Sequence, residues 1–465
     1  MNKLFLRTTC VFFCVYMLSG CANLSGRGLF SHYSASTSES RAALGQGQYQ
    51  QALDVLPDDI AGPILDGMEK GRLNFLLRDY PESLSAFQQS DLAVRVQEDA
   101  AEIQISEGLN QAGSLFTNDN MITYQASDYE LGFLHLYLSL NYIQKHDLNA
   151  ALVEVRRANR VQEAAKKRRE SELAAAEERM DSEGLSDNIG AVLSRYPGAG
   201  KTLSAVQNGY LFYLSGMLYE ADGSLSDAYI DYKRALAVAP DNDYVAQAVQ
   251  RLAVRLDMKD DLQLLTRKYG PWQSPPSTTG RLIILDEQGV VQAPEGWRAP
   301  LWVYQSNGQN VLYNMALPHY PPRPMVLPGP MVMDGRPLKA TPLANVTQMA
   351  RQSLNEAMPA RVLRQALRVI AKDQFRQAAA QNGDELGNAL ANIFNTLTEQ
   401  PDTRSWQSLP AQVALYQEDL MPGSHLIQWQ GQSVEAEIKQ GRTTFVWVSR
   451  QGQTMNGWSV LLGGN

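Results

Sequence analysis

Cysteine is nearly missing from this chain of 465 residues. The three cysteines are Cys10, Cys14 and Cys21, and no other follows them. The long remainder of the chain therefore has no disulfide, no thiolate metal site and no cysteine nucleophile. Its stability must come from the packing of a hydrophobic core.

Sequence motifs for catalysis are also lacking. The chain has no Gly-x-Ser-x-Gly turn and no His-Glu-x-x-His helix. The run Gly198-Ala199-Gly200-Lys201-Thr202 ends like a phosphate-binding loop, but Arg195 stands where such a loop needs its first glycine, so we expect a flexible connector there. The histidines are dispersed without metal-binding spacing, and they are His32, His135, His146, His319 and His425. We expect no metal and no cofactor, and His135 is interpreted as a packing residue.

The chain also lacks an excess of basic residues. Acidic residues outnumber basic ones by 49 to 41, which gives a formal charge of -8. A mildly acidic protein is a poor candidate for binding nucleic acid or anionic lipid headgroups through its bulk charge. The chain is also longer than one compact core usually is, which predicts two or three domains. The helical and strand patterns along the chain together predict an α+β multidomain fold.

The first 20 residues have the order of a secretory signal. Lys3 and Arg7 precede an apolar stretch over residues 10–18, which is too short to cross a membrane. The run Leu18-Ser19-Gly20-Cys21 then resembles the lipobox of bacterial lipoproteins. This resemblance implies that residues 1–20 are removed and that Cys21 is acylated. Ala22 in place of an aspartate implies the outer membrane. The serine-rich segment after Cys21 predicts a flexible tether over residues 21–41.

Residues 42–270 contain little proline and have helical apolar spacing. The clearest segment resembles the tetratricopeptide repeat, with small residues for close helix approach, tyrosines that fill the groove between helices, a glycine turn and a terminal proline. Its matching positions are Phe212, Gly216, Tyr219, Gly223, Ala228, Tyr232, Ala235 and Pro240.

Weaker copies of the repeat precede this segment. One includes Gly71, Tyr80 and Phe87, another spans residues 139–158, and a fragment begins at Gly47. The intervening copy near residues 98–131 is degenerate. We therefore expect a solenoid of three to five helical hairpins, which residues 243–269 would cap.

The helical signal that starts at Asn149 continues to Arg179, well past the length of a repeat helix. Two interpretations are open. The extension is either a projecting partner site or a solvated helix stabilised by charge pairs such as Lys166 with Glu170. Acidic residues largely neutralise its basic run, which argues against a phosphate-binding patch.

The composition changes after Trp272. Short apolar runs predict strands and a proline-rich loop over residues 280–345, helices over 346–400, and strands again over 401–465, where a small β-sandwich-like module is expected. Three prolines among residues 270–280 block helix continuation. They predict an exposed linker between two separate folding units.

The segment from Leu420 to Ile427 resembles the small β modules typified by the PEGA motif. The lipobox, the repeats and the run around Arg404 and Trp406 together resemble an uncharacterised family of proteobacterial outer-membrane lipoproteins. The resemblance does not bring an enzymatic activity with it. Arg404 and Trp406 could form a recognition surface, or a structural corner that ties a helix to the β module.

Three functions are compared. The leading hypothesis is a lipid-anchored scaffold that faces the periplasm and binds an envelope protein through its repeats. The alternative is a regulator of envelope assembly or of peptidoglycan synthesis, or a partner of the secretion machinery, that acts through the C-terminal β region. The third, a cell-wall hydrolase, requires paired carboxylates, for which the candidates are Asp286, Glu287, Asp402 and Glu418.

Overall fold

The structure is a computed structural model that describes residues 32–106, 123–182, 193, 208–304, 310–381 and 400–463. Cys21, the signal segment, the run 198–202 and residues 382–399 of the helical segment expected over 346–400 lie outside these residues. Helices and sheets are both present, so the chain has an α+β fold.

The described part begins with two short helices, α3 (Tyr33–Ser36) and α4 (Ser38–Gly45), so the flexible tether expected over residues 21–41 is wrong for residues 33–41. Ser34 is buried, and its backbone N–H donates to Thr403 Oγ1 at 3.1 Å. Thr37 is also buried and donates from Oγ1 to Gln407 Oε1 at 2.9 Å. Composition alone indicates disorder, because the partners of Ser34 and Thr37 lie far away in sequence.

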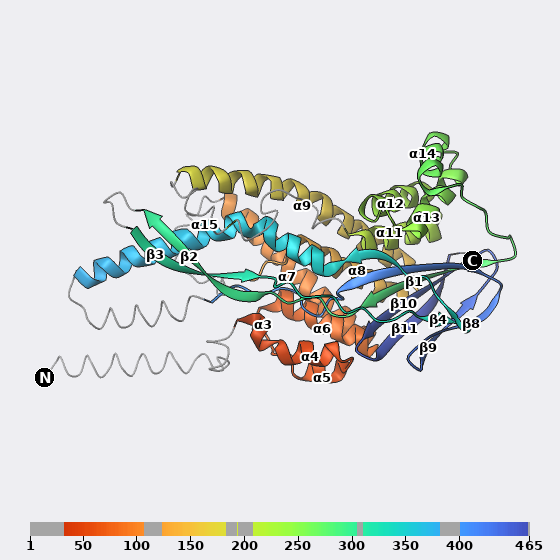
Figure 1. Cartoon of the computed structure of the whole chain (residues 1–465), viewed down its shortest axis with the longest axis horizontal. Helices are drawn as coiled ribbons and strands as arrows, with labels where there is room; N and C mark the ends of the chain where they lie inside the picture. Colours follow the sequence, from red (N-terminus) through yellow and green to blue (C-terminus); the bar gives the residue numbers. More distant parts are fainter. Residues whose placement is uncertain are drawn as a thin grey trace.

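Further helices follow in consecutive pairs. Each helix packs against the next, as α6 does on α7, and each pair contacts the following one (Figure 1). These helices are α5 (Tyr49–Asp54), α6 (Pro63–Leu77), α7 (Tyr80–Ser106), α8 (Asp128–Gln144), α9 (Leu148–Ser182), α11 (Gly209–Asp222), α12 (Leu225–Val238), α13 (Asp243–Arg255) and α14 (Lys259–Tyr269).

Local sequence explains where these helices begin and end. Ser127 and Glu130 form a capping box at the start of α8. The side chains of Asn208 and Asn242 accept two backbone N–H groups each at the starts of α11 and α13. Gly223 ends α11 with a φ of 86°, a left-handed conformation that favours glycine.

The strands form a five-stranded sheet with the order β11-β10-β1-β7-β6, a four-stranded sheet with the order β5-β4-β8-β9, and the hairpin β2-β3. Only the pairing of β1 with β10 is parallel among the described strand pairs. The strands are β1 (Gly280–Gln288), β2 (Glu295–Tyr304), β3 (Asn310–His319), β4 (Val332–Met333), β5 (Arg336–Pro337), β6 (Thr341–Asn345), β7 (Gln412–Leu420), β8 (Gly423–Trp429), β9 (Gln432–Ile438), β10 (Thr443–Gln451) and β11 (Thr454–Leu462).

Strand β1 explains why the module expected over residues 401–465 is not self-contained. It comes from the preceding segment, yet it lies between β10 and β7 in the middle of the larger sheet. Its apolar run is buried on both faces. Ile283 and Leu285 face the helices, whereas Leu282 and Ile284 pack on the smaller sheet.

One hydrophobic core crosses the boundary that the prolines predicted. It joins residues of all the helical pairs to the helix-facing residues of the larger sheet, among them Leu285, Leu415 and Trp447. The prediction of separate domains with separate cores is therefore wrong. The linker interrupts the helices but does not interrupt the packing, because the sheet returns to cover them.

A projecting arm extends from this core. It combines the β2-β3 hairpin with α15 (Val346–Gln381), and α15 also contacts the long helix α9 (Figure 1). Pro359 lies within α15 without dividing it into two helices. A second core cluster holds the arm together, with Leu301, Met315 and Met358 at its centre.

Candidate functional site

Arg404 and Trp406, the candidates for a recognition surface, are both buried. Trp406 is fully buried, and its ring lies 5.8 Å from that of Phe87 and 5.7 Å from that of Tyr137. The Arg404 side chain is 7% exposed and donates from Nε to Asp402 at 2.9 Å. The recognition interpretation is therefore wrong, and the structural corner describes the geometry.

Two buried carboxylates hold this corner. Glu69 on α6 accepts the backbone N–H groups of Gln407 at 2.6 Å and Ser408 at 3.0 Å. Glu130 on α8 accepts the backbone N–H of Trp406 at 2.7 Å. Burial raises the pKa of Glu69 to about 7, in opposition to these hydrogen bonds. The helical pairs thus bind the chain just before β7.

The residues expected to pack the clearest repeat lie on α11, on α12 and directly after α12. A side chain added at Gly216 would come within 2.9 Å of the Tyr232 ring. Tyr219 is 8% exposed and accepts from Arg156 Nε at 3.3 Å. Helix α12 ends at Val238, and the Pro240 carbonyl accepts from Tyr269. The residues of the set that are fully buried are Ala228, Tyr232 and Ala235.

Asp286 and Glu287, two of the acidic residues proposed for a hydrolase, do not form a catalytic pair. Asp286 and Glu287 are neighbours on β1, so their side chains point to opposite faces of the sheet. Glu287 pairs with Arg72 at 2.6 Å, and Asp286 bonds Arg450 Nε at 2.9 Å, all four side chains being fully buried. Each carboxylate is neutralised inside its own layer.

The histidines within the described residues do not converge. His135 Nδ1 lies 2.8 Å from Glu154 Oε2, and His425 Nδ1 lies 2.6 Å from Asp334 Oδ2. Across the described ranges, no group of three or more histidine, cysteine or acidic residues is placed to hold a metal ion.

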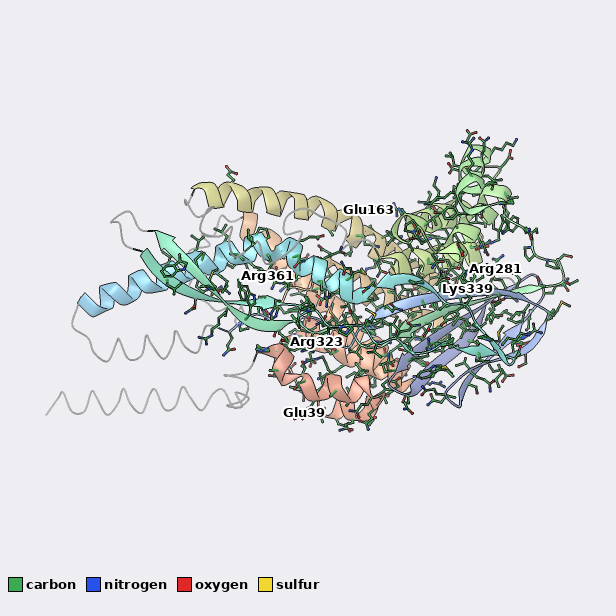
Figure 2. All side chains as sticks on the ribbon, in the orientation of Figure 1. Glu39, Glu163, Arg281, Arg323, Lys339 and Arg361 are labelled. Atoms are coloured by element: carbon green, nitrogen blue, oxygen red, sulfur yellow. The ribbon has the colours of Figure 1, made fainter. Side chains whose placement is uncertain are left out.

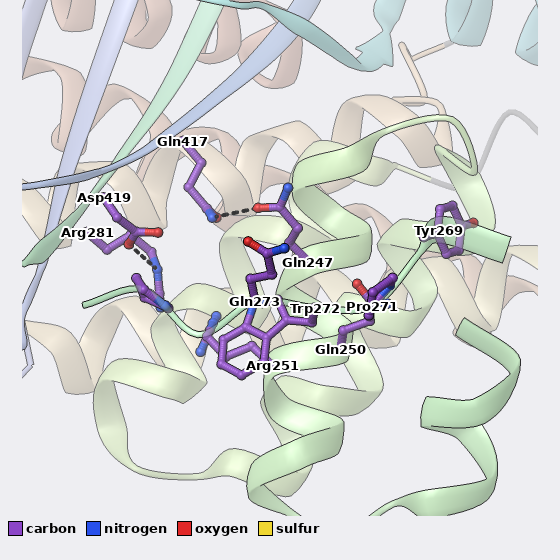
Figure 3. Close-up of a pocket in the computed structure, with 11 residues that line it drawn as sticks. Gln247, Gln250, Arg251, Tyr269, Pro271, Trp272, Gln273, Arg281, Gln417 and Asp419 are labelled. Carbon is purple, nitrogen blue, oxygen red and sulfur yellow. Dashed lines mark hydrogen bonds and ion pairs between the residues drawn. The ribbon is translucent and has the colours of Figure 1, made fainter. Parts of the chain in front are cut away.

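A polar pocket of about 260 Å³ lies where the helices meet the larger sheet. Its side chains come from both sides, the helices on one and the strands on the other, and the linker adds Trp272 (Figure 3). Figure 2 shows the same junction, with Arg281 and Lys339 labelled. The lining residues are Gln247, Gln250, Arg251, Tyr269, Pro271, Trp272, Gln273, Pro275, Arg281, Gln417 and Asp419.

The alternation of the strands explains why the pocket is polar. On the helix-facing side of β1, Arg281 lies two residues before Ile283 in sequence. On the same side of β7, Leu415 is followed by Gln417 and then by Asp419, which lies opposite Arg281 in the register. The face of the sheet therefore changes from apolar to polar where the helical core ends.

The linker is held over this polar end. Helix α14 ends at Tyr269 and is capped by Gly270, whose φ is 83°. The Gly270 carbonyl accepts from Gln250 Nε2 at 2.7 Å. Pro271 prevents the helix from continuing. The linker expected to be merely exposed thus places Trp272 and Gln273 in the wall of the pocket.

Two arginines of the pocket share one buried carboxylate. Arg251 binds Glu220 with two hydrogen bonds, one of them 2.8 Å long from its second terminal nitrogen to Oε2. The terminal nitrogen of Arg281 is 3.6 Å from Glu220, and its Nε is 3.9 Å from Asp419. Burial opposes ionisation of Glu220, but the arginines outweigh it and hold the pKa of Glu220 below its usual range.

Comparisons with known proteins leave this site to be judged on its geometry. No family model and no curated protein matches the chain. Of the helices in the described ranges, none combines the length and apolar character needed to cross a membrane.

Sequence reasoning missed this pocket. Arg251 lies among the buried residues of α13, and Arg281 opens a buried strand. A charged residue at such a core position was the available signal, because buried charges require a partner. The sequence does not reveal that the two arginines meet.

Proposed function

We propose that this chain is a lipid-anchored scaffold of the bacterial outer membrane that faces the periplasm and binds a protein partner in the pocket between helices and sheet. The observation that carries the proposal is the composition of the pocket. Its polar side chains, among them Arg281, Gln417 and Trp272, can position a ligand by hydrogen bonding and stacking. We propose a binding role, not an enzymatic one.

We also propose finer assignments for the two parts of the fold. The contact of Gly216 with Tyr232 supports tetratricopeptide-like packing of the helical pairs. The hydrophobic cluster between the two sheets, which includes Ile284, Val446 and Ile427, supports a β-sandwich-like arrangement. These assignments, with the lipobox, also support membership in the proteobacterial lipoprotein family that the sequence resembles.

The proposed membrane anchor would tether the start of α3 to the outer membrane. Cys21 precedes the first residue of α3, Tyr33, by a segment that spans roughly 40 Å at most when fully extended. The scaffold would therefore act on partners near the inner surface of that membrane.

A regulator of envelope assembly or peptidoglycan synthesis, or a partner of secretion machinery, remains the second candidate. The sequence assigns this function to the C-terminal β region. However, the pocket draws Gln250 and Arg251 from the helices and Arg281 and Gln417 from the sheet. Isolated halves would each lack part of the site, so binding tests require the full chain.

Photo-crosslinking in intact cells tests the proposal. A photoreactive amino acid replaces Gln273 in the pocket or, as a control of the same residue type, the exposed Gln50 on α5. We expect a discrete protein adduct from position 273 and not from position 50. The absence of any adduct at position 273 would contradict the proposed binding site.

A further inference from the structure

Arg281 has hydrogen-bonding capacity that its surroundings do not use. Its Nε is buried and has no hydrogen-bond partner, and its two ion pairs are long, at 3.6 and 3.9 Å. Arg251, by contrast, is satisfied by Glu220 with two hydrogen bonds. Burial and then the charge of Arg251 lower the pKa of Arg281. A further anion closer to Arg281 would offset both effects.

The geometry of a guanidinium selects the anion. Its planar fork of N–H groups matches the two oxygens of a carboxylate, which can accept two parallel hydrogen bonds. The neighbouring Gln417 has a buried Oε1 that also lacks a hydrogen-bond partner. This oxygen can accept an N–H group, which a peptide carries close to its carboxylate.

Strand β7 supplies the reason to expect an extended peptide. β1 pairs with β7 along its whole length, from Gln412 to Leu420. β6 pairs only with the part from Gln412 to Leu415. From Tyr416 onwards, β7 thus has a paired strand on one side only among the described strands. An added strand can pair with such an edge, beside Gln417 and Asp419 of the pocket.

We propose that the pocket binds a carboxylate carried by an extended peptide segment of the partner, with Arg281 as its main contact. This inference rests on the proposed function, because it specifies which chemistry of the partner the scaffold recognises. The carboxylate belongs either to the end of the partner chain or to an acidic side chain. Trp272 offers a flat apolar surface to the peptide residue next to this carboxylate.

Titration of the full-length detergent-solubilised protein with small probes tests the proposal. The probes are N-acetyl-tetraalanine with a free carboxylate, the same peptide as its amide, and an amidated peptide with one internal aspartate. We expect a free carboxylate to bind at least about tenfold more tightly than the neutral amide. The tighter of the two acids identifies the source of the carboxylate, and equal binding of both acids and the neutral amide would overturn the proposal.

Variants assign the effect to the residue. Arg281→Gln should abolish the preference for the acids, whereas Arg95→Gln on α7 should keep it, because Arg95 lies outside the pocket lining and its side chain is 57% exposed. Asp419→Asn should tighten binding of the acids, since it removes a competing negative charge near Arg281. A misfolded variant could not bind more tightly. A preference that survives in Arg281→Gln, or weaker binding by Asp419→Asn, would overturn the assignment.

Three further outcomes separate the parts of this inference from one another and from the proposed function. N-acetylmuramic acid carries a carboxylate on a sugar, and its binding in place of both acidic peptides would overturn the peptide part. If the position-273 adduct forms equally well in the Arg281→Gln protein, the scaffold proposal is supported and the carboxylate inference is wrong. If acidic peptides bind as expected but no adduct forms in cells, the carboxylate site stands and the scaffold proposal fails.

Discussion

Replacement of Trp406 by alanine should destabilise the whole molecule. Trp406 is fully buried, contacts the rings of Phe87 and Tyr137, and donates from Nε1 to Ser408 Oγ at 2.9 Å. Truncation of a buried tryptophan or phenylalanine to alanine typically costs about 3–5 kcal/mol. The two aromatic contacts and the hydrogen bond favour the upper part of this range.

Urea unfolding measures this cost. Helical circular dichroism and tryptophan fluorescence should report the same transition for the wild type, because one core joins helices and sheet. The midpoint of Trp406→Ala should fall by roughly 1 M in both signals, because the m value of a chain this long is about 3 kcal/mol/M or more. Trp302→Ala is the matched control, since Trp302 is 53% exposed and its loss should change stability by no more than about 0.5 kcal/mol. A change below about 1 kcal/mol for Trp406→Ala would refute its place in the joint core.

Other predictions concern the same architecture. Glu69 has a folded pKa of about 7 against an ordinary value of 4.5, so the folded state holds a proton that the unfolded state releases, and its stability contribution is lost as pH rises from about 4.5 to 7. Glu69→Gln should remove that slope from a series of urea titrations, and an unchanged slope would contradict the assignment. Gly216→Leu should lower stability by about 1–3 kcal/mol in thermal unfolding, because the side chain would meet Tyr232, and an unchanged melting temperature would exclude that contact. Fragment 42–270 alone should unfold at lower urea than the full chain, since it loses the sheet that covers its core, and equal stability would show that it folds independently. Cys21→Ser should end incorporation of a fatty-acid analogue, and continued labelling would contradict the lipoprotein proposal.

The helices could be read from the sequence because their signals are local. Apolar spacing and turn glycines act within a few residues, so ranges such as 243–269 were expected to be helical and are. The apolar run of β1 was likewise visible as a strand. Its position between β10 and β7 was not, because strand pairing joins segments far apart in the chain.

The same reason explains the errors at the joint. The sequence singles out Arg404 and Trp406 as either a recognition surface or a structural corner, because spacing cannot tell a buried corner from an exposed surface. The serine-rich start of the chain was expected to be flexible because the residues that satisfy Ser34 and Thr37 lie near position 405. The sequence does not reveal the pocket, because Arg251, Trp272 and Arg281 come from three elements and meet only when the sheet packs on the helices.

The central claim is that ligand binds where the helices meet the sheet. Fluorine NMR of the full chain tests it directly, with fluorotryptophan at all seven tryptophan positions and signals assigned by single Trp→Phe variants. On addition of N-acetyl-tetraalanine, we predict a shift of the Trp272 signal that is lost in Arg281→Gln, while the Trp302 signal on the hairpin stays constant. A shift of Trp302 with Trp272 unmoved would contradict the claim and assign binding to the arm.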